Sequence, residues 1–204
     1  MRNRIWPMKD DSPSPQSSPA SLISRLALPN TAYITNIYDS MARVLINELK
    51  NSGGTVLNSH LYAYNTGNQR TKQTRTAGDY IDYTYDDIGQ LKTAKAKESG
   101  GSTERLHEQF SYVYDAAGNL AYRTNNALVQ NFSVNSLNQL TTAGRSGTLT
   151  VAGTTTTNAT SVTVNSQTAE RYSDATFAKD GFSLSSGNNA FTATASDSLG
   201  RSSS

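Results

Sequence analysis

Two histidines are the residues of this 204-residue chain with the clearest potential for acid–base or metal chemistry. The segment His107-Glu108-Gln109-Phe110-Ser111 begins like the zinc-protease helix motif, but Ser111 stands where the second metal ligand belongs. His60 lies in a strand-like segment, where a solvated side chain is expected. The sequence therefore predicts no metal site and no bound cofactor.

Aspartates form the second group with chemical potential, because glycoside hydrolysis needs two carboxylates at a fixed separation. Asp86, Asp115 and Asp197 all stand where turns are expected to begin, and capping of local amides explains them there. The chain has no cysteine, which excludes thiolate metal sites, disulfides and a cysteine nucleophile. The glycine pairs at 53–54 and 100–101 lack the lysine and hydroxyl residues of a phosphate-binding loop. We predict that the chain is not an enzyme.

The composition favours β-structure with many turns. Hydrophobic residues make up 35% of the chain and charged residues 17%, so Ser, Thr, Asn and Gly supply most of its polarity. The net charge of +2 is too small to attract nucleic acid or an acidic membrane surface. No stretch reaches the length of a membrane span, and residues 1–11 lack the apolar run of an export signal.

Proline and tyrosine divide the chain into three parts. All five prolines precede residue 30, so residues 1–30 are predicted to be a disordered Pro/Ser-rich linker. Without proline, the remainder can be sheet throughout. Ten of the eleven tyrosines lie between Tyr33 and Tyr122, whereas Ser and Thr dominate the end of the chain. We predict a repeat-containing β-sheet region at 31–144 and a separate β-domain at 145–204.

Residues 37–140 contain five copies of one repeat, in which a pair of hydrophobic residues two positions apart precedes an Asp or Asn and a turn. The copies are 20 to 29 residues apart, so loops of variable length separate a fixed turn. The last copy is Phe132 to Leu140. The residues predicted to carry the structural motif are Tyr38 and Asp39; Tyr62, Tyr64, Asn65 and Gly67; Tyr83, Tyr85, Asp86, Gly89 and Leu91; and Tyr112, Tyr114, Asp115, Gly118 and Leu120.

Each motif has the residue types of a tight β-hairpin. An Asp or Asn at the first position caps local amides, and a Gly or Asn at the fourth accepts a positive φ. In such a hairpin Asp86 opposes Gln90 and Tyr85 opposes Leu91, and the copies ending at Leu120 and Leu140 repeat the arrangement. Polar turns between the motifs complete an antiparallel β-meander. Residues 102–110 also fit a helix, with Leu106 and Phe110 four apart.

The intact motif at Tyr112 to Leu120 resembles the tyrosine-aspartate (YD) repeat of bacterial RHS proteins, which are related to insecticidal toxin-complex subunits and teneurins. This resemblance implies a β-sheet ribbon that spirals into a hollow shell and encloses a carboxy-terminal toxin. Three copies depart from the pattern: Asp39 lacks its glycine, Asn65 replaces Asp, and the last copy has lost both Tyr and Asp. We expect those hairpins to be more weakly formed.

Residues 145–204 show the alternation of half-buried strands, with Val162 and Val164 as one pair and Phe182 and Leu184 as another. The stretches 181–191 and 195–201 resemble bacterial immunoglobulin-like sandwich domains. Such a domain usually needs about seven strands. We count four or five here, which leaves the completeness of this small Ig-like β-sandwich open.

Two functions fit these features. The first is a non-enzymatic structural part of an RHS-repeat shell or surface protein, secreted or at the cell surface as part of a larger bacterial protein. Its partners would be neighbouring repeats, with an enclosed toxin or a surface glycan as further candidates. The alternative is an adhesion module whose tyrosines, near Lys and Arg residues, bind carbohydrate or a host protein. Tyrosines placed regularly before each turn favour cross-strand packing over ligand binding.

Overall fold

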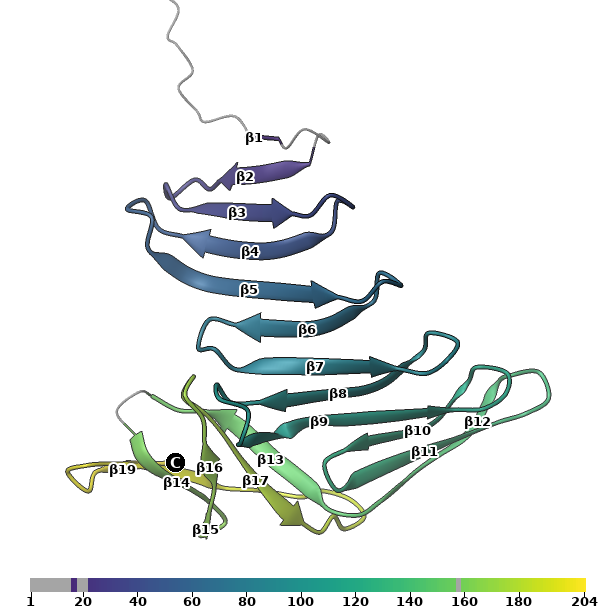
Figure 1. The fold of residues 1–204 in the computed structure, drawn as a ribbon. Coiled ribbons are helices and arrows are strands. Elements are labelled where there is room, and N and C mark those ends of the chain that lie inside the picture. The colour runs from purple at the N-terminus through teal and green to yellow at the C-terminus, as the bar shows by residue number, and fades with distance from the viewer. Residues whose placement is uncertain (1–15, 18–21, 157–158) are drawn as a thin grey trace, which may run out of the picture. The chain divides into compact units, whose positions relative to one another are not determined.

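The computed structural model describes residues 16–17, 22–156 and 159–204, and its regular structure in these ranges consists of β-strands (Figure 1). The predicted all-β antiparallel fold is confirmed. Over the same ranges, no helix is long and apolar enough to cross a membrane. The chain divides into two compact units after Tyr62, a division that lies within the predicted repeat region and that the sequence did not indicate.

In the first unit, consecutive strands pair antiparallel in chain order from β1 to β5. Two strands correct the predicted linker at 1–30. Gln16–Ser17 form β1, which pairs with β2, and Ile23–Ala27 form β2, which pairs with β3 through Arg25 opposite Thr35. Residues 1–15 and 18–21 of that predicted linker lie outside the described residues. The strands are β1 (Gln16–Ser17), β2 (Ile23–Ala27), β3 (Tyr33–Tyr38), β4 (Val44–Lys50) and β5 (Val56–Tyr64), the last of which crosses into the second unit.

The second unit begins with an antiparallel meander in which each strand from β6 to β12 pairs with the next. Residues 104–110, which also fitted a helix, form the first part of β9 and are paired with β8. The strands are β6 (Arg70–Arg75), β7 (Tyr80–Tyr85), β8 (Leu91–Lys97), β9 (Glu104–Tyr114), β10 (Leu120–Asn125), β11 (Leu128–Val134) and β12 (Leu140–Ser146).

The hairpin register predicted from the turn residues is confirmed. Tyr85 pairs with Leu91, and the amide of Asp86 donates to the carbonyl of Gln90 at 3.0 Å. The equivalent pairs close the next two repeat hairpins of the meander, Tyr114 with Leu120 in β9–β10 and Val134 with Leu140 in β11–β12.

The C-terminal part of the second unit contains seven strands, more than the four or five counted in the sequence. They form a three-stranded sheet in the order β13-β17-β16 and a four-stranded sheet in the order β15-β14-β18-β19. That these two sheets have an immunoglobulin-like arrangement stays a prediction. The strands are β13 (Leu149–Thr154), β14 (Ala159–Val164), β15 (Gln167–Thr168), β16 (Glu170–Arg171), β17 (Thr176–Phe182), β18 (Ala193–Asp197) and β19 (Ser202–Ser203).

The main apolar core lies between these two small sheets. Val162 and Val164 from one sheet contact Phe177 and Phe182 from the other, and all four side chains are buried. Gly153 lies opposite Phe177 in the register, and a Cβ at position 153 would come within 2.9 Å of the Phe177 ring. The missing side chain therefore makes room for the aromatic ring that fills the core.

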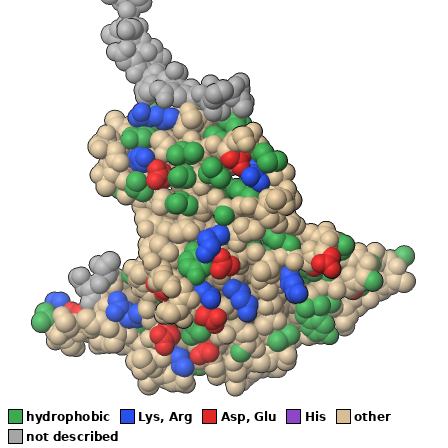
Figure 2. Space-filling model, in the orientation of Figure 1, with side chains coloured by type: hydrophobic (Ala, Val, Ile, Leu, Met, Phe, Trp, Pro, Cys, Tyr) green, Lys and Arg blue, Asp and Glu red, His purple; other side chains and the backbone are tan. Residues whose placement is uncertain are grey.

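The meander has little core of its own. Among the described residues of β6 to β12, the buried hydrophobic side chains are Ala94 and Ala96. Larger residues such as Val113 and Leu140 stay exposed, and Figure 2 shows hydrophobic side chains at the surface of the molecule. Hydrogen bonds and polar contacts must therefore contribute more to the order of these strands than apolar burial does.

We predict that Gly118→Val is more damaging than Ala117→Val. Gly118 has a φ of 83°, where a β-branched residue is strained by about 1–3 kcal/mol. Ala117, its neighbour in the same turn, is not among the residues with positive φ. Chemical denaturation of both variants measures the difference. Equal losses of stability at the two positions would contradict the turn assignment.

Candidate functional site

The repeated turns have one hydrogen-bonding pattern. In four copies the side-chain oxygen of the first residue accepts two backbone amides at 2.8 to 3.1 Å, from the residues two and four positions later. The fourth residue has a positive φ in all five copies, and in the second copy this residue is Asn68 rather than Gly67. The first residues of the four copies are Asp39, Asp86, Asp115 and Asn135.

The three copies expected to be weaker form the same turn. Ala42 adopts a φ of 62° in place of glycine, and Asn68 and Asn138 adopt 62° and 60°. Asparagine tolerates this conformation better than most residues, because its short amide bonds locally to the backbone. In the Asp39 copy, the guanidinium of Arg43 also donates to the carboxylate at 2.6 Å. An ion pair across the turn thus accompanies the missing glycine there.

Hydrogen bonds lower the pKa values of two capping aspartates, Asp39 and Asp115. The backbone amide of Arg43 lowers the pKa of Asp39, and the side-chain amide of Asn119 lowers that of Asp115. Both carboxylates are therefore charged hydrogen-bond acceptors at neutral pH. This confirms the capping role inferred from the sequence for Asp115, and the bonds from Ile88 and Gln90 confirm it for Asp86.

The second tyrosine of the motif connects its strand to the preceding one. The hydroxyl of Tyr85 donates to the carbonyl of Arg70 at 2.8 Å, and that of Tyr114 donates to Leu91 at 3.1 Å. In the first unit, Tyr38 donates to Ile23 at 2.9 Å in the same way. Each acceptor is the first residue of the strand before the motif. These tyrosines thus connect neighbouring strands through their hydroxyls, a contact additional to the cross-strand packing expected from their spacing.

Within the second unit, side chains also connect successive turns. The amide of Gln69 donates to the carbonyl of Gly89 at 3.2 Å, and the amide of Asn119 donates to the side-chain oxygen of Asn138 at 2.9 Å. These contacts join turns that are one repeat or more apart in the chain. These side-chain hydrogen bonds help to fix the position of each repeat turn next to the following one.

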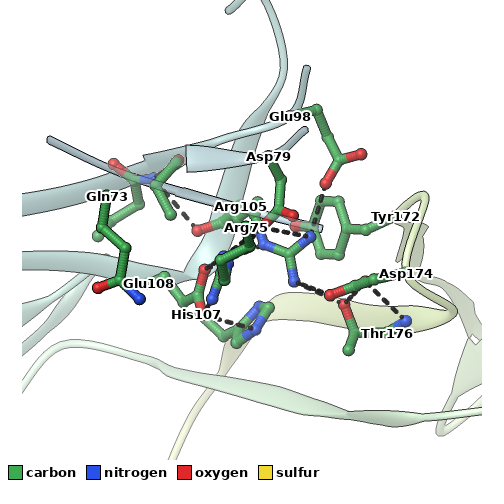
Figure 3. Close-up of polar contacts among 12 residues, drawn as sticks. Gln73, Arg75, Asp79, Glu98, Arg105, His107, Glu108, Tyr172, Asp174 and Thr176 are labelled. Atoms are coloured by element: carbon green, nitrogen blue, oxygen red, sulfur yellow. Dashed lines mark hydrogen bonds and ion pairs between the residues drawn. The ribbon is translucent and has the colours of Figure 1, made fainter. Parts of the chain in front are cut away.

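A buried arginine joins the meander to the C-terminal sheets (Figure 3). The side chain of Arg105, in β9, is 1% exposed and makes hydrogen bonds with all three of its guanidinium nitrogens. Nη1 donates to Glu98 at 2.6 Å and Nε to Glu108 at 3.0 Å, both within the meander. Nη2 donates to Asp174 and Thr176, at 2.8 Å each, just before and at the start of β17. We call this group the Arg105 cluster.

A second arginine balances the carboxylates of the cluster. Arg75 holds Glu108 through two hydrogen bonds, from Nη1 at 2.8 Å and from Nη2 at 2.6 Å. It also contacts Asp79, whose side chain is as buried as that of Arg105. A planar guanidinium matches a carboxylate in this two-bond geometry, which fixes distance and direction together.

Tyr172 completes the junction from the C-terminal side. Its ring lies 4.7 Å from the guanidinium carbon of Arg105, a cation–π distance, and its hydroxyl accepts the backbone amide of Leu106 at 2.8 Å. Glu98 extends the contact in the other direction, because it accepts the amide of Ser173 at 3.0 Å. The junction is therefore polar throughout and specific in its partners.

The cluster keeps its carboxylates ionised. Burial raises the pKa of Asp174, but the hydrogen bonds from Arg105 and Thr176 outweigh it and set the value at about 2. Burial also opposes ionisation of Glu98 and Glu108, whose pKa values are nevertheless lowered by bonds from Ser173 and Arg75 respectively. Desolvation lowers the pKa of His107, so this histidine is neutral at pH 7.

The structure places each of the two histidines beside a tyrosine ring. The ring of His107 is tilted against that of Tyr172 with 5.7 Å between their centroids, and the ring of His60 is stacked on that of Tyr62 at 6.3 Å. Within the described ranges, no group of three or more His, Asp or Glu residues could hold a metal ion. The role that the contacts of the Arg105 cluster support is structural: they hold the C-terminal sheets against the meander.

Sequence reasoning missed the Arg105 cluster. Its members Glu98, Arg105, Glu108 and Asp174 are separated by up to 76 residues, and no local pattern distinguishes them from surface charges. The alternation within 104–114 gave no signal, because Leu106, Phe110 and Tyr112 stand at even positions and Arg105 falls among the mostly polar odd positions. Its burial becomes visible only in the structure, where it has the partners that a buried charge requires.

No protein-family model and no curated protein matches this chain. Solved structures with a similar fold include TcdB2-TccC3-Cdc42 (TM-score 0.57, 15% identity, 87% of this chain and 9% of that chain). They also include TcdB2-TccC3 without its hypervariable C-terminal region (0.56, 16%, 91% and 10%) and a Photorhabdus luminescens Tc holotoxin pore with a mutated TccC3 (0.57, 14%, 92% and 9%). This chain spans about a tenth of each of them. It has the fold of a segment of these solved structures.

We predict that Arg105→Ala lowers the free energy of unfolding by about 3–5 kcal/mol, because it leaves several carboxylates without their buried counter-charge. Lys95→Ala is the matched control, since Lys95 is an exposed cation of the adjacent strand β8 and should change stability by less than about 0.5 kcal/mol. Urea denaturation measures both. Similar small effects at the two positions would refute the junction role of Arg105.

We predict that stability falls with pH in the range set by Asp174. Its folded pKa of about 2 lies below the ordinary value of 3.8, so its contribution is fully present above pH 3.8 and is lost as the pH falls through about 2. Asp174→Asn should flatten this part of the pH–stability curve, whereas Asp87→Asn, at an exposed turn carboxylate, should not. Urea melts between pH 5 and pH 2 test it. An unchanged curve for Asp174→Asn would be inconsistent with the ionised cluster.

Proposed function

We propose that this chain is a wall segment of an RHS-type β-sheet shell, a non-enzymatic structural part of a larger protein of the toxin-complex type. The observation that carries the proposal is the repeated turn with its cross-strand tyrosine hydrogen bond. The same contacts recur at successive hairpins, and they occupy the tyrosine hydroxyls and the aspartate carboxylates in holding strands and turns together. Such a ribbon can be extended by adding hairpins, which is what a shell wall requires.

The exposure of the meander supports this role. Its strands are mostly half-buried, and large side chains such as Val113 and Tyr122 remain about half exposed. A sheet that is one layer thick gains little from burying its own faces. In a closed shell, neighbouring repeats and enclosed cargo would cover such residues. We therefore propose neighbouring repeats of the same parent protein as the main partners and an enclosed toxin as the cargo.

The alternative of a carbohydrate- or host-protein-binding module has less support. A sugar-stacking tyrosine needs an open ring face and a hydroxyl available to its ligand. The hydroxyls of Tyr38, Tyr85 and Tyr114 instead bond to backbone carbonyls, and that of Tyr83 donates to Gln73 at 3.2 Å.

As a part of a shell that delivers a toxin, the chain would act outside the cell or at its surface.

We predict that the isolated chain self-associates and shows no enzymatic turnover. Exposed strand edges template pairing with other chains, and a net charge of +2 supplies little repulsion. Light scattering across a concentration series, beside glycosidase, protease and nuclease assays, measures this. A glycan array adds the binding alternative, with Tyr83→Ala as the test variant.

Three results would each count against the wall function. The first is a strictly monomeric particle at high concentration. The second is turnover that disappears in Asp86→Asn or Asp115→Asn. The third is glycan binding that Tyr83→Ala abolishes while the variant stays folded.

A further inference from the structure

The last hairpin of the chain has the geometry of a repeat turn, although the sequence assigns it to the C-terminal domain. Asp197 accepts the amides of Leu199 at 2.9 Å and Arg201 at 3.0 Å. Its own amide donates to the carbonyl of Arg201 at 3.0 Å, and Gly200 has a φ of 77°. These are the bonds and the positive φ found at Asp39, Asp86 and Asp115.

Two further features match. Ser196 pairs with Ser202, the positions that Tyr85 and Leu91 hold relative to Asp86. The guanidinium of Arg201 donates to Asp197 at 2.7 Å, as that of Arg43 does to Asp39 at 2.6 Å. The side-chain bond from Arg201 also lowers the pKa of Asp197, so the cap is charged at neutral pH.

In four of the five repeat copies the strand that follows the turn is paired on both sides, and the exception is β12, which over the described residues pairs with β11 alone. β4 pairs with β3 and β5, β8 with β7 and β9, and β10 with β9 and β11. β19 occupies the same place after the Asp197 turn, but over the described residues it pairs with β18 alone. Its second edge therefore presents backbone donors and acceptors of the kind that the next strand of a repeat would use.

A groove of about 780 Å³ lies beside this edge, between the two small sheets. Its apolar lining comes from Val162, Phe177, Ala193 and Ala195. Ser and Thr residues at 154–156 and 202–204 form the rim, with Asp197 and Arg201 paired to each other. The groove thus presents no unbalanced charge, which suits a strand of apolar and uncharged polar residues.

We propose that β18 and β19 form a further copy of the repeat hairpin, and that the outer edge of β19 accepts an antiparallel strand of the repeat type seated over this groove. β11 is the template for the occupant, because it pairs with the far side of β10 as the incoming strand would pair with β19. Its sequence, Leu128–Val134, contains apolar and uncharged polar residues and no charge. This proposal rests on the proposed wall function and adds to it. The C-terminal domain would itself contribute a repeat hairpin, to which a further strand of the ribbon can pair.

The probe is a synthetic peptide with the sequence of residues 128–134 and a two-lysine tail for solubility, added to the ¹⁵N-labelled full chain. Amide hydrogen exchange at Ser202 and Ser203 should slow at least about tenfold at saturating peptide, equivalent to about 1.4 kcal/mol. A peptide with proline at its second and fourth positions, which cannot donate to a ladder from those positions, should leave the exchange unchanged.

Two variants tie binding to the turn. Asp197→Ala removes the cap and should abolish the protection, while Glu170→Ala, at an exposed carboxylate of β16, should retain it. A folded spectrum of Asp197→Ala outside 193–204 shows that only the hairpin is affected.

Three outcomes would overturn the proposal. These are no saturable protection of Ser202 and Ser203, protection that survives Asp197→Ala, or protection that appears without peptide as the chain self-associates, which would make a second copy the occupant. None of them decides the wall function, which depends on the light-scattering, turnover and glycan measurements.

Discussion

The repeat hairpins of this chain depend on a capped turn. In four copies one side-chain oxygen accepts two backbone amides, and in all five the residue three positions later takes a positive φ. The two features act together, because the left-handed residue directs the backbone so that the amides point at the cap. The turn then fixes which residues face each other in the strands that follow. In a sheet with period-two alternation, a slip by one residue would exchange the two faces. The turn therefore decides where the tyrosines lie, and the tyrosines decide how hairpins attach to one another.

The tolerance of this turn explains how the repeat can vary in sequence and keep its geometry. Glycine, asparagine and alanine all occupy the left-handed position, and Asp and Asn both occupy the cap. Where alanine replaces glycine, an arginine bonds to the capping carboxylate. The expected weakness of the degenerate copies rested on residue identity alone. The physical requirement is an acceptor at the first position and a tolerable φ at the fourth, which several residues meet.

Local chemistry made the all-β fold, the hairpin register and the capping aspartates predictable from the sequence. The features that the sequence did not reveal depend on distant contacts. Ile23–Ala27 form a strand because β3 offers an edge to pair with, although their own alternation is weak next to a proline-rich stretch. The Arg105 cluster connects residues 69 and 71 positions apart, and each charge in it looks like an ordinary surface residue in the sequence. Two-residue strands such as β15 and β16 are too short for any periodicity to mark them.

A polar junction has a physical advantage in a structure built this way. The meander offers few buried apolar residues, and an apolar interface on a one-layer sheet would be indifferent to register, since hydrophobic contact has no direction. A guanidinium that bonds Glu98, Glu108, Asp174 and Thr176 at once admits one arrangement, because any shift leaves a buried charge without its partner. Desolvation of these charges opposes the contact between the meander and the C-terminal sheets. The cluster therefore fixes how the two parts are placed more than it adds to the free energy of unfolding. Directional charge-assisted hydrogen bonds thus hold the C-terminal sheets at a fixed place on the meander, which apolar packing alone would not do.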